Sequence, residues 1–165
     1  MKTLSMDFVS WSLSLVNTWG YLGIFLINLL GSATIIFPVP SFAVVFVLGS
    51  ILNPWLLGFF AALGSAFGEF TGYLAGLGGR SIGEKKLKKW FDIAEKWVKK
   101  HGFFFVIFIF AATPLPMDVI GIFSGAVRYN PKKFFLAVFL GKLIVSWVLA
   151  WGGFFGIKWL LNFFS

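Results

Sequence analysis

The chain has 165 residues, of which 59% are hydrophobic and 12% charged, and its net charge is +8. A soluble domain has about a quarter of its residues charged, so this composition excludes an ordinary soluble protein and predicts an integral membrane protein. The absence of cysteine excludes disulfides and thiol catalysis, and a single histidine, His101, excludes a histidine-rich metal site.

The basic residues are unevenly distributed along the chain. Eight of the 14 lie between Arg80 and Lys100. This clustering indicates contact with a membrane surface and control of topology, not nucleic-acid binding. We therefore expect membrane lipids as partners, no nucleic acid, no cofactor and no metal. The sequence leaves the oligomeric state open, a homo-oligomer included.

Residues 1–19 are expected to form an N-terminal helix. A signal peptide fits poorly, because only one lysine precedes the apolar stretch and no small-x-small cleavage site follows it. The helix either lies in the membrane interface or crosses the bilayer, and the sequence does not separate these alternatives.

Residues 20–79 form the first predicted unit, whose apolar run is interrupted by Pro38 and Pro40. Proline removes a backbone donor and clashes with the preceding turn, so two prolines spaced by one residue cannot both lie in a continuous helix. The apolar segment after the break, 41–52, is too short to cross alone, since a spanning helix needs about 20 residues. We expect a re-entrant hairpin with its tip at these prolines, followed by a spanning helix over 54–77.

Residues 80–101 differ completely in character. Apolar side chains recur at helical spacing with lysines off that face, which predicts a basic amphipathic helix in the headgroup plane. Residues 102–165 then form a second unit with the same plan. Its hairpin tip is at Pro114 and Pro116, its spanning helix covers 134–151, and an aromatic tail after Gly152 and Gly153 completes the chain.

The two units are related by an internal duplication that pairs all six prolines. Three residues recur 76 positions later and three recur 77 positions later: Pro38, Pro40 and Gly49, then Asn53, Pro54 and Gly64. A re-entrant hairpin returns to its own side and the helix after it crosses once, so the second unit must enter from the opposite side. The predicted fold is therefore an all-α, multi-pass plasma-membrane protein of two inverted repeats joined by the amphipathic helix. Placing 80–101 in the cytoplasm puts 11 of the 14 basic residues there, as the positive-inside rule requires.

Four ionisable residues fall in otherwise apolar surroundings: Glu69, Asp118, Arg128 and Lys142. A charge at the bilayer centre costs about 2.5 kcal/mol or more, so such residues pair or face an aqueous path. At a rise of about 1.5 Å per residue, Glu69, Asp118 and Lys142 reach a common mid-depth.

These charges predict a substrate site at the midplane. Lys142 would attract an anionic group, aided by Arg128 and by the half-helix N-termini that carry Ser41 and Asp118. Glu69 or Asp118 would take up and release a proton. The structural alternative is a Glu69–Lys142 or Asp118–Lys142 ion pair that locks the repeats together, with Asp118 serving as a helix cap.

The Pro-x-Pro tips, the Asn-Pro restarts and the pattern Gly68, Gly72, Tyr73, Gly76 resemble the DedA family, also called the VTT or SNARE-associated family. A second block, Ser-Gly-Ala followed by Gly141 and Trp147, is also similar. The resemblance covers about residues 20–155 and is strongest to the short, YqaA-like branch. It implies a transporter-like fold of two inverted re-entrant units. It also implies flipping or scrambling of phospholipids or polyprenyl phosphates, in some relatives coupled to protons.

The chain departs from the family's usual charge pattern. Ser41 stands where an acidic residue is usual after the first tip, and the two arginines that flank the second tip correspond to Ala112 and Asp118. Lys142 is left as the intramembrane cation. We expect a lipid translocase for an anionic lipid and not an enzyme. The alternatives are a small-solute or ion transporter with the same fold, and a non-transporting membrane-organising protein.

Overall fold

The computed structural model describes residues 18–33, 41–78, 101–113 and 115–164, together with the isolated positions 14, 96, 98 and 100. Side chains are described as far as residue 156. Most of 1–19, most of 80–101 and the tip prolines Pro38, Pro40 and Pro114 lie outside the described residues, as therefore do the predictions made for them. Of the four tip prolines, Pro116 is described.

Every regular element in the described residues is an α-helix, which confirms the predicted all-α class. The bounds are α2 (Tyr21–Ala33), α3 (Ser41–Gly49), α4 (Pro54–Leu77), α6 (Phe103–Ala112), α7 (Met117–Ala126) and α8 (Pro131–Phe164).

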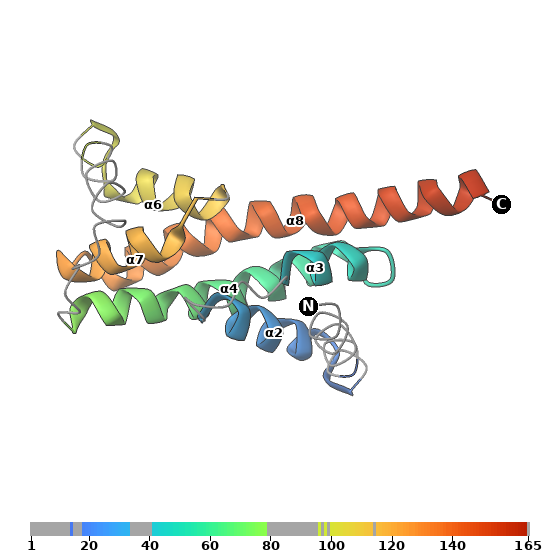
Figure 1. The fold of residues 1–165 in the computed structure, drawn as a ribbon, viewed down its shortest axis with the longest axis horizontal. Helices are drawn as coiled ribbons and strands as arrows, with labels where there is room; N and C mark the ends of the chain where they lie inside the picture. Colours follow the sequence, from blue (N-terminus) through green and yellow to red (C-terminus); the bar gives the residue numbers. More distant parts are fainter. Residues whose placement is uncertain are drawn as a thin grey trace, which may run out of the picture.

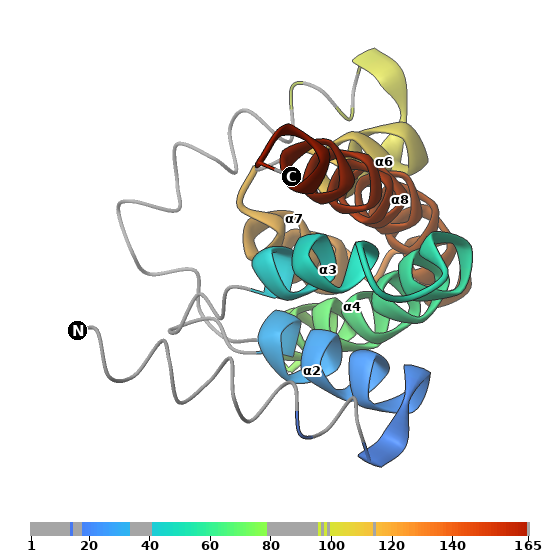
Figure 2. The same ribbon diagram turned by 90° about the vertical axis from the view of Figure 1, so that its right-hand side faces the viewer.

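The two long helices, α4 and α8, lie side by side and run in opposite directions (Figure 1). The short helices are distributed between them in a reciprocal way. α2 packs on α4 and α6 packs on α8, on opposite sides of the pair (Figure 2). α3 packs mainly on α8, whereas α7 packs on α4. The second short helix of each half, α3 or α7, therefore packs on the long helix of the other half.

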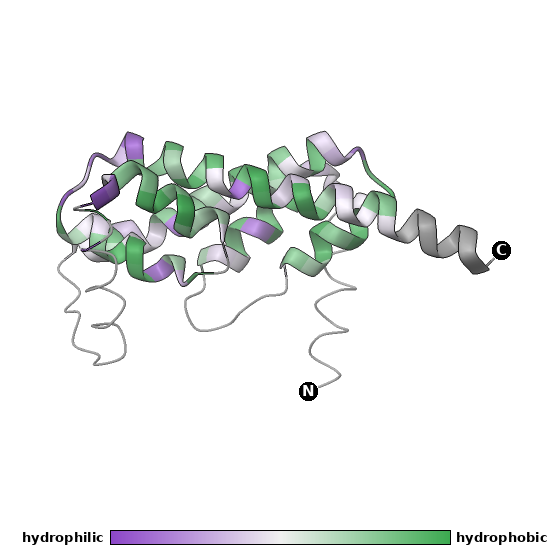
Figure 3. Ribbon diagram, turned by 90° about the horizontal axis from the view of Figure 1, so that it is seen from above, coloured by the Kyte–Doolittle hydropathy of each residue, from purple (hydrophilic) through white to green (hydrophobic). Residues whose placement is uncertain are grey.

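The apolar contacts form two cores, one toward each end of the α4–α8 pair. One includes Ile107, Phe110 and Phe134, and the other includes Ile27, Leu48 and Leu57. Both cores contain residues of α4 and α8, so neither half of the chain builds its core alone. Many large apolar side chains nevertheless face outward, and the hydrophilic positions gather at one end with a few near the middle (Figure 3). An exterior with many exposed large apolar side chains is typical of a surface that faces lipid.

The predicted helix start after Asn53 is confirmed, and Asn53 and Asn130 are both N-caps. The Oδ1 atom of Asn53 accepts hydrogen bonds from the backbone N–H groups of Trp55 (3.0 Å) and Leu56 (3.5 Å). Asn130 Oδ1 accepts equivalent bonds from Lys132 (3.0 Å) and Lys133 (3.1 Å). A proline follows each cap, where its missing donor costs nothing.

Removing either cap is expected to destabilise the protein by about 1 kcal/mol, because two N–H groups of the first turn lose their acceptor. Thermal unfolding of purified Asn53→Ala and Asn130→Ala in detergent measures this loss. Aspartate caps equally well, so Asn53→Asp and Asn130→Asp serve as controls that keep the stability. Unchanged unfolding of both alanine variants would contradict the capping assignment.

The prediction that the second long helix covers 134–151 and ends before a glycine tail is wrong. α8 begins at Pro131 and continues through Gly152 and Gly153 to Phe164. The glycines are explained by packing and not by a helix end. At Gly153 the backbone of α8 lies against that of α3, and a Cβ there would overlap the backbone carbonyl of Phe46. Glycine is weakly helix-forming, but close packing against a neighbouring helix outweighs that preference.

Within the described residues, one helical segment is both long and apolar enough to cross a membrane by length and composition, Pro131–Gly156 of α8. α4 has 24 residues and therefore the length of a span, but it contains five glycines and Glu69, which lower its hydropathy. The predicted bounds of α4 agree with the structure at both ends. Its role as a second span belongs to the proposal below.

Candidate functional site

An ion pair joins the two long helices at mid-length. Lys142 Nζ of α8 lies 2.8 Å from Glu69 Oε1 of α4, and the two side chains are 11% and 9% exposed. Charges this deeply buried are costly unless they are paired, so loss of either side chain would leave the other as an uncompensated buried charge. Of the two pairings that the sequence allowed for Lys142, the structure forms the one with Glu69.

The two short helices that follow the proline breaks also reach this ion pair. The ring of Phe42, in the first turn of α3, lies 6.0 Å from Lys142 Nζ, within the range of a cation–π contact. Asp118, in the first turn of α7, lies close enough for its charge to interact with both Lys142 and Glu69. Residues of α3 and α7 therefore lie near the ion pair that joins α4 and α8.

Asp118 is not the N-cap of its helix, as one of the two readings of the sequence had it. Pro116 occupies that position, and no side chain caps the first turn of α7. Asp118 lies two residues further along, where a carboxylate is favoured by the helix dipole while its oxygens stay available to other partners. Ser41 is the first residue of α3, and its side chain is buried.

Arg128 does not join this group. It follows the end of α7 with a positive φ of 53°, is exposed, and donates its backbone N–H to the Gly125 carbonyl at 2.9 Å. Ten residues separate it from Asp118, which corresponds to about 15 Å along a helix axis. A positive φ in a residue that closes a helix satisfies the last carbonyls, so the conformation of Arg128 has a local explanation.

Sequence reasoning missed Phe42, which lies beside Lys142, and did not single out the buried Ser146. Ser146 is buried one turn beyond Lys142, and Ser65 is buried one turn before Glu69 on the facing helix. The duplication contained the signal for both: an offset of 77 pairs Glu69 with Ser146 and Ser65 with Lys142. The offset of 76 pairs Phe42 with Asp118, the two first-turn residues that approach Lys142.

These positions lie within the range covered by a known domain. The family model of the VTT domain matches residues 39–155. The chain belongs to the VTT domain family. This confirms the resemblance seen in the proline and glycine pattern. VTT proteins, also known as the DedA family, are membrane-associated, which agrees with the composition of this chain.

Curated relatives of this VTT protein cover most of its length. An uncharacterized protein of Methanocaldococcus jannaschii is 34% identical over 147 residues, which is 83% of this chain and 86% of that protein. The inner membrane protein YqaA of Escherichia coli is 28% identical over 118 residues, 70% of this chain and 78% of YqaA. The protein of the same name in Shigella flexneri matches equally well. No solved structure gives a significant match.

Proposed function

We propose that this VTT protein is a lipid translocase, a flippase or scramblase that moves an anionic lipid between the leaflets of the cell membrane, and that it is not an enzyme. The observation that carries the proposal is the buried Glu69–Lys142 pair, with the first turns of α3 and α7 beside it. An ionisable group at membrane depth is expensive, and it is found mostly where a substrate or ion must pass.

The proposal includes an inverted repeat, and the close helix crossings support it. A Cβ on Gly49 of α3 would overlap the carbonyl of Ala150, and one on Gly125 of α7 would overlap the carbonyl of Tyr73. The offsets of 76 and 77 relate both members of these contacts. Equivalent glycines thus meet equivalent residues of the other half, which is the packing that a pseudo-two-fold axis between antiparallel halves produces.

A second pair of crossings follows the same rule. Gly76 of α4 meets the carbonyl of Ile122 in α7, and Gly153 of α8 meets that of Phe46 in α3. The lengths of α3 and α7 support re-entrant hairpins. They have 9 and 10 residues, so they extend about 15 Å, half the thickness of the hydrocarbon core. With 80–101 in the cytoplasm, the two hairpins would enter from opposite faces and meet at the ion pair.

The transport step follows from competition for one lysine. Lys142 pairs with Glu69 at rest, and an anionic headgroup that reaches the site would replace Glu69 as its partner. The N–H groups at the starts of α3 and α7 would add donors for a phosphate. Two carboxylates and one lysine leave an excess negative charge when all are ionised, and uptake of a proton by Glu69 or Asp118 would remove it. This provides a route to proton coupling.

Reconstituted liposomes test the proposal. We expect the wild-type protein to accelerate leaflet exchange of fluorescent phosphatidylglycerol or polyprenyl phosphate over empty liposomes, as measured by dithionite quenching. The double variant Glu69→Met/Lys142→Met removes both charges at similar volume, which keeps the helices together. We expect this variant to fold but to exchange lipid at the rate of empty liposomes.

Two outcomes would replace the proposal. If lipid exchange is absent but solute or ion flux depends on Glu69, the protein is a transporter of small molecules. If neither lipid nor solute moves in liposomes, and the double variant replaces the wild-type protein in cells without a change in phenotype, the charges are structural and the protein organises the membrane.

A further inference from the structure

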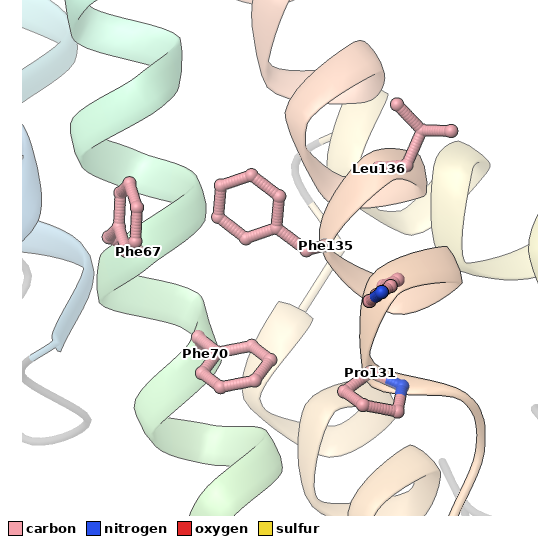
Figure 4. Close-up of a pocket in the computed structure, with 6 residues that line it drawn as sticks. Phe67, Phe70, Pro131, Phe135 and Leu136 are labelled. Atoms are coloured by element: carbon pink, nitrogen blue, oxygen red, sulfur yellow. The ribbon is translucent and has the colours of Figure 1, made fainter.

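A groove outside the ion-pair site opens between α4 and the first two turns of α8. Its volume is about 510 Å³, which lies within the range of ligand sites. Five of its lining residues are apolar and the sixth is basic. They are Phe67 and Phe70 of α4, and Pro131, Lys132, Phe135 and Leu136 of α8 (Figure 4).

Aromatic rings form the walls of the groove and hold its shape. The rings of Phe67 and Phe135 meet edge to face with centroids 4.9 Å apart, and those of Phe70 and Phe135 lie 6.5 Å apart. The backs of these rings are supported in turn, because Phe67 contacts Phe25 of α2 and Phe70 stacks on Tyr73. The groove is therefore built on packed helices and not on loops.

The groove opens outward, toward where lipid would lie. Phe67 is 49% exposed and Leu136 is 50% exposed, so the two sides of its mouth are apolar and uncovered. Around a membrane protein such a groove meets acyl chains, and five of the six side chains that line it are apolar.

The basic residue lies at the end of the groove that is nearest the start of α8. The backbone of Lys132 is fixed in the first turn by the Asn130 cap, and its side chain is exposed. A lysine there can extend along the apolar wall and present its ammonium group at headgroup level. The first turn of a helix adds positive potential to that of the lysine. An apolar slot that ends in a positive charge is complementary to an acyl chain that ends in a phosphate.

We propose that this groove holds one acyl chain of an anionic phospholipid whose phosphate pairs with Lys132. The site is separate from the Glu69–Lys142 pair, and a lipid can occupy it whether or not the protein translocates lipid.

Native mass spectrometry of the purified full-length protein tests the groove. Phosphatidylglycerol and phosphatidylcholine with identical acyl chains are added separately, and the bound fraction is compared. The variants are Lys132→Ala, which removes the phosphate partner, and Leu136→Trp, which narrows the mouth. Lys133→Ala is the matched control, because Lys133 is also exposed in the same turn but is not among the residues that line the groove.

We expect the wild type to retain phosphatidylglycerol better than phosphatidylcholine. Lys132→Ala should weaken retention of phosphatidylglycerol about fivefold more than Lys133→Ala does. Leu136→Trp should weaken both lipids, whereas glycerol 3-phosphate, which has no acyl chain, should not compete. Equal effects of Lys132→Ala and Lys133→Ala, or full retention by Leu136→Trp, would overturn the proposal. Circular dichroism confirms that each variant is folded, and both lysine positions are exposed enough to tolerate alanine.

Discussion

Lys142→Ala is expected to lower the free energy of unfolding by about 3–5 kcal/mol, because it leaves the Glu69 carboxylate buried without its partner. The loss is measured by thermal unfolding in detergent and by the yield of folded protein from membranes. Asp118 cannot replace the lysine, since it carries the same sign as Glu69. The reverse single variant, Glu69→Ala, should cost a similar amount, because it leaves Lys142 buried and Asp118, the other carboxylate nearby among the described residues, is partly exposed.

The double variant Glu69→Met/Lys142→Met separates the cost of an unpaired charge from the value of the pair. Replacing a buried ion pair by apolar residues of similar volume is often neutral or stabilising, so we expect the double variant to unfold near the wild-type temperature. If the double variant is as unstable as Lys142→Ala, the pair is required for folding. Loss of lipid exchange in a stable double variant would assign the pair to transport.

Gly125→Ala and Gly76→Ala are expected to destabilise the α4–α7 crossing by about 1–3 kcal/mol each. At both positions the added Cβ would overlap a backbone carbonyl, that of Tyr73 or that of Ile122. Backbone cannot move aside as a flexible side chain can, so the helices must separate. The equivalent change Gly153→Ala should have a comparable effect on the α3–α8 crossing. Thermal unfolding in detergent measures each variant.

Gly72→Ala is the matched control for this series. Gly72 lies one turn before Gly76 on α4, yet an added Cβ there meets no neighbouring atom within 4 Å. Alanine is also the better helix former, by about 0.5–1 kcal/mol, so this variant should be neutral or slightly stabilised. If Gly72→Ala destabilises as much as Gly76→Ala, loss of glycine itself and not the close crossing accounts for the effect.

Much of the helix layout could be predicted from local chemistry. The Asn-Pro pairs mark helix starts because a side-chain acceptor and a proline satisfy the first turn without help from the rest of the protein. The prolines alone predict breaks before Ser41 and Met117, and the predicted helix bounds 54–77 agree with the structure. The end of α8 could not be predicted in this way. Gly152 and Gly153 look like a helix stop until Phe46 of α3 is known to lie against them.

In the candidate site, too, some features could be predicted from the sequence and others required the tertiary structure. The axial rise of a helix is a property of the backbone, so the sequence alone predicts that Glu69, Asp118 and Lys142 lie at a common level. It could not say which carboxylate pairs with Lys142, nor that Phe42 lies beside it, because the facing sides of two helices depend on how those helices cross. The crossings are set by glycines whose contacts come from the other half of the chain. The sequence therefore determined the helix class, the Asn-capped helix starts and the proline positions between helices. Only the tertiary structure determined the partners, since helices that pack at backbone distance decide together which faces meet.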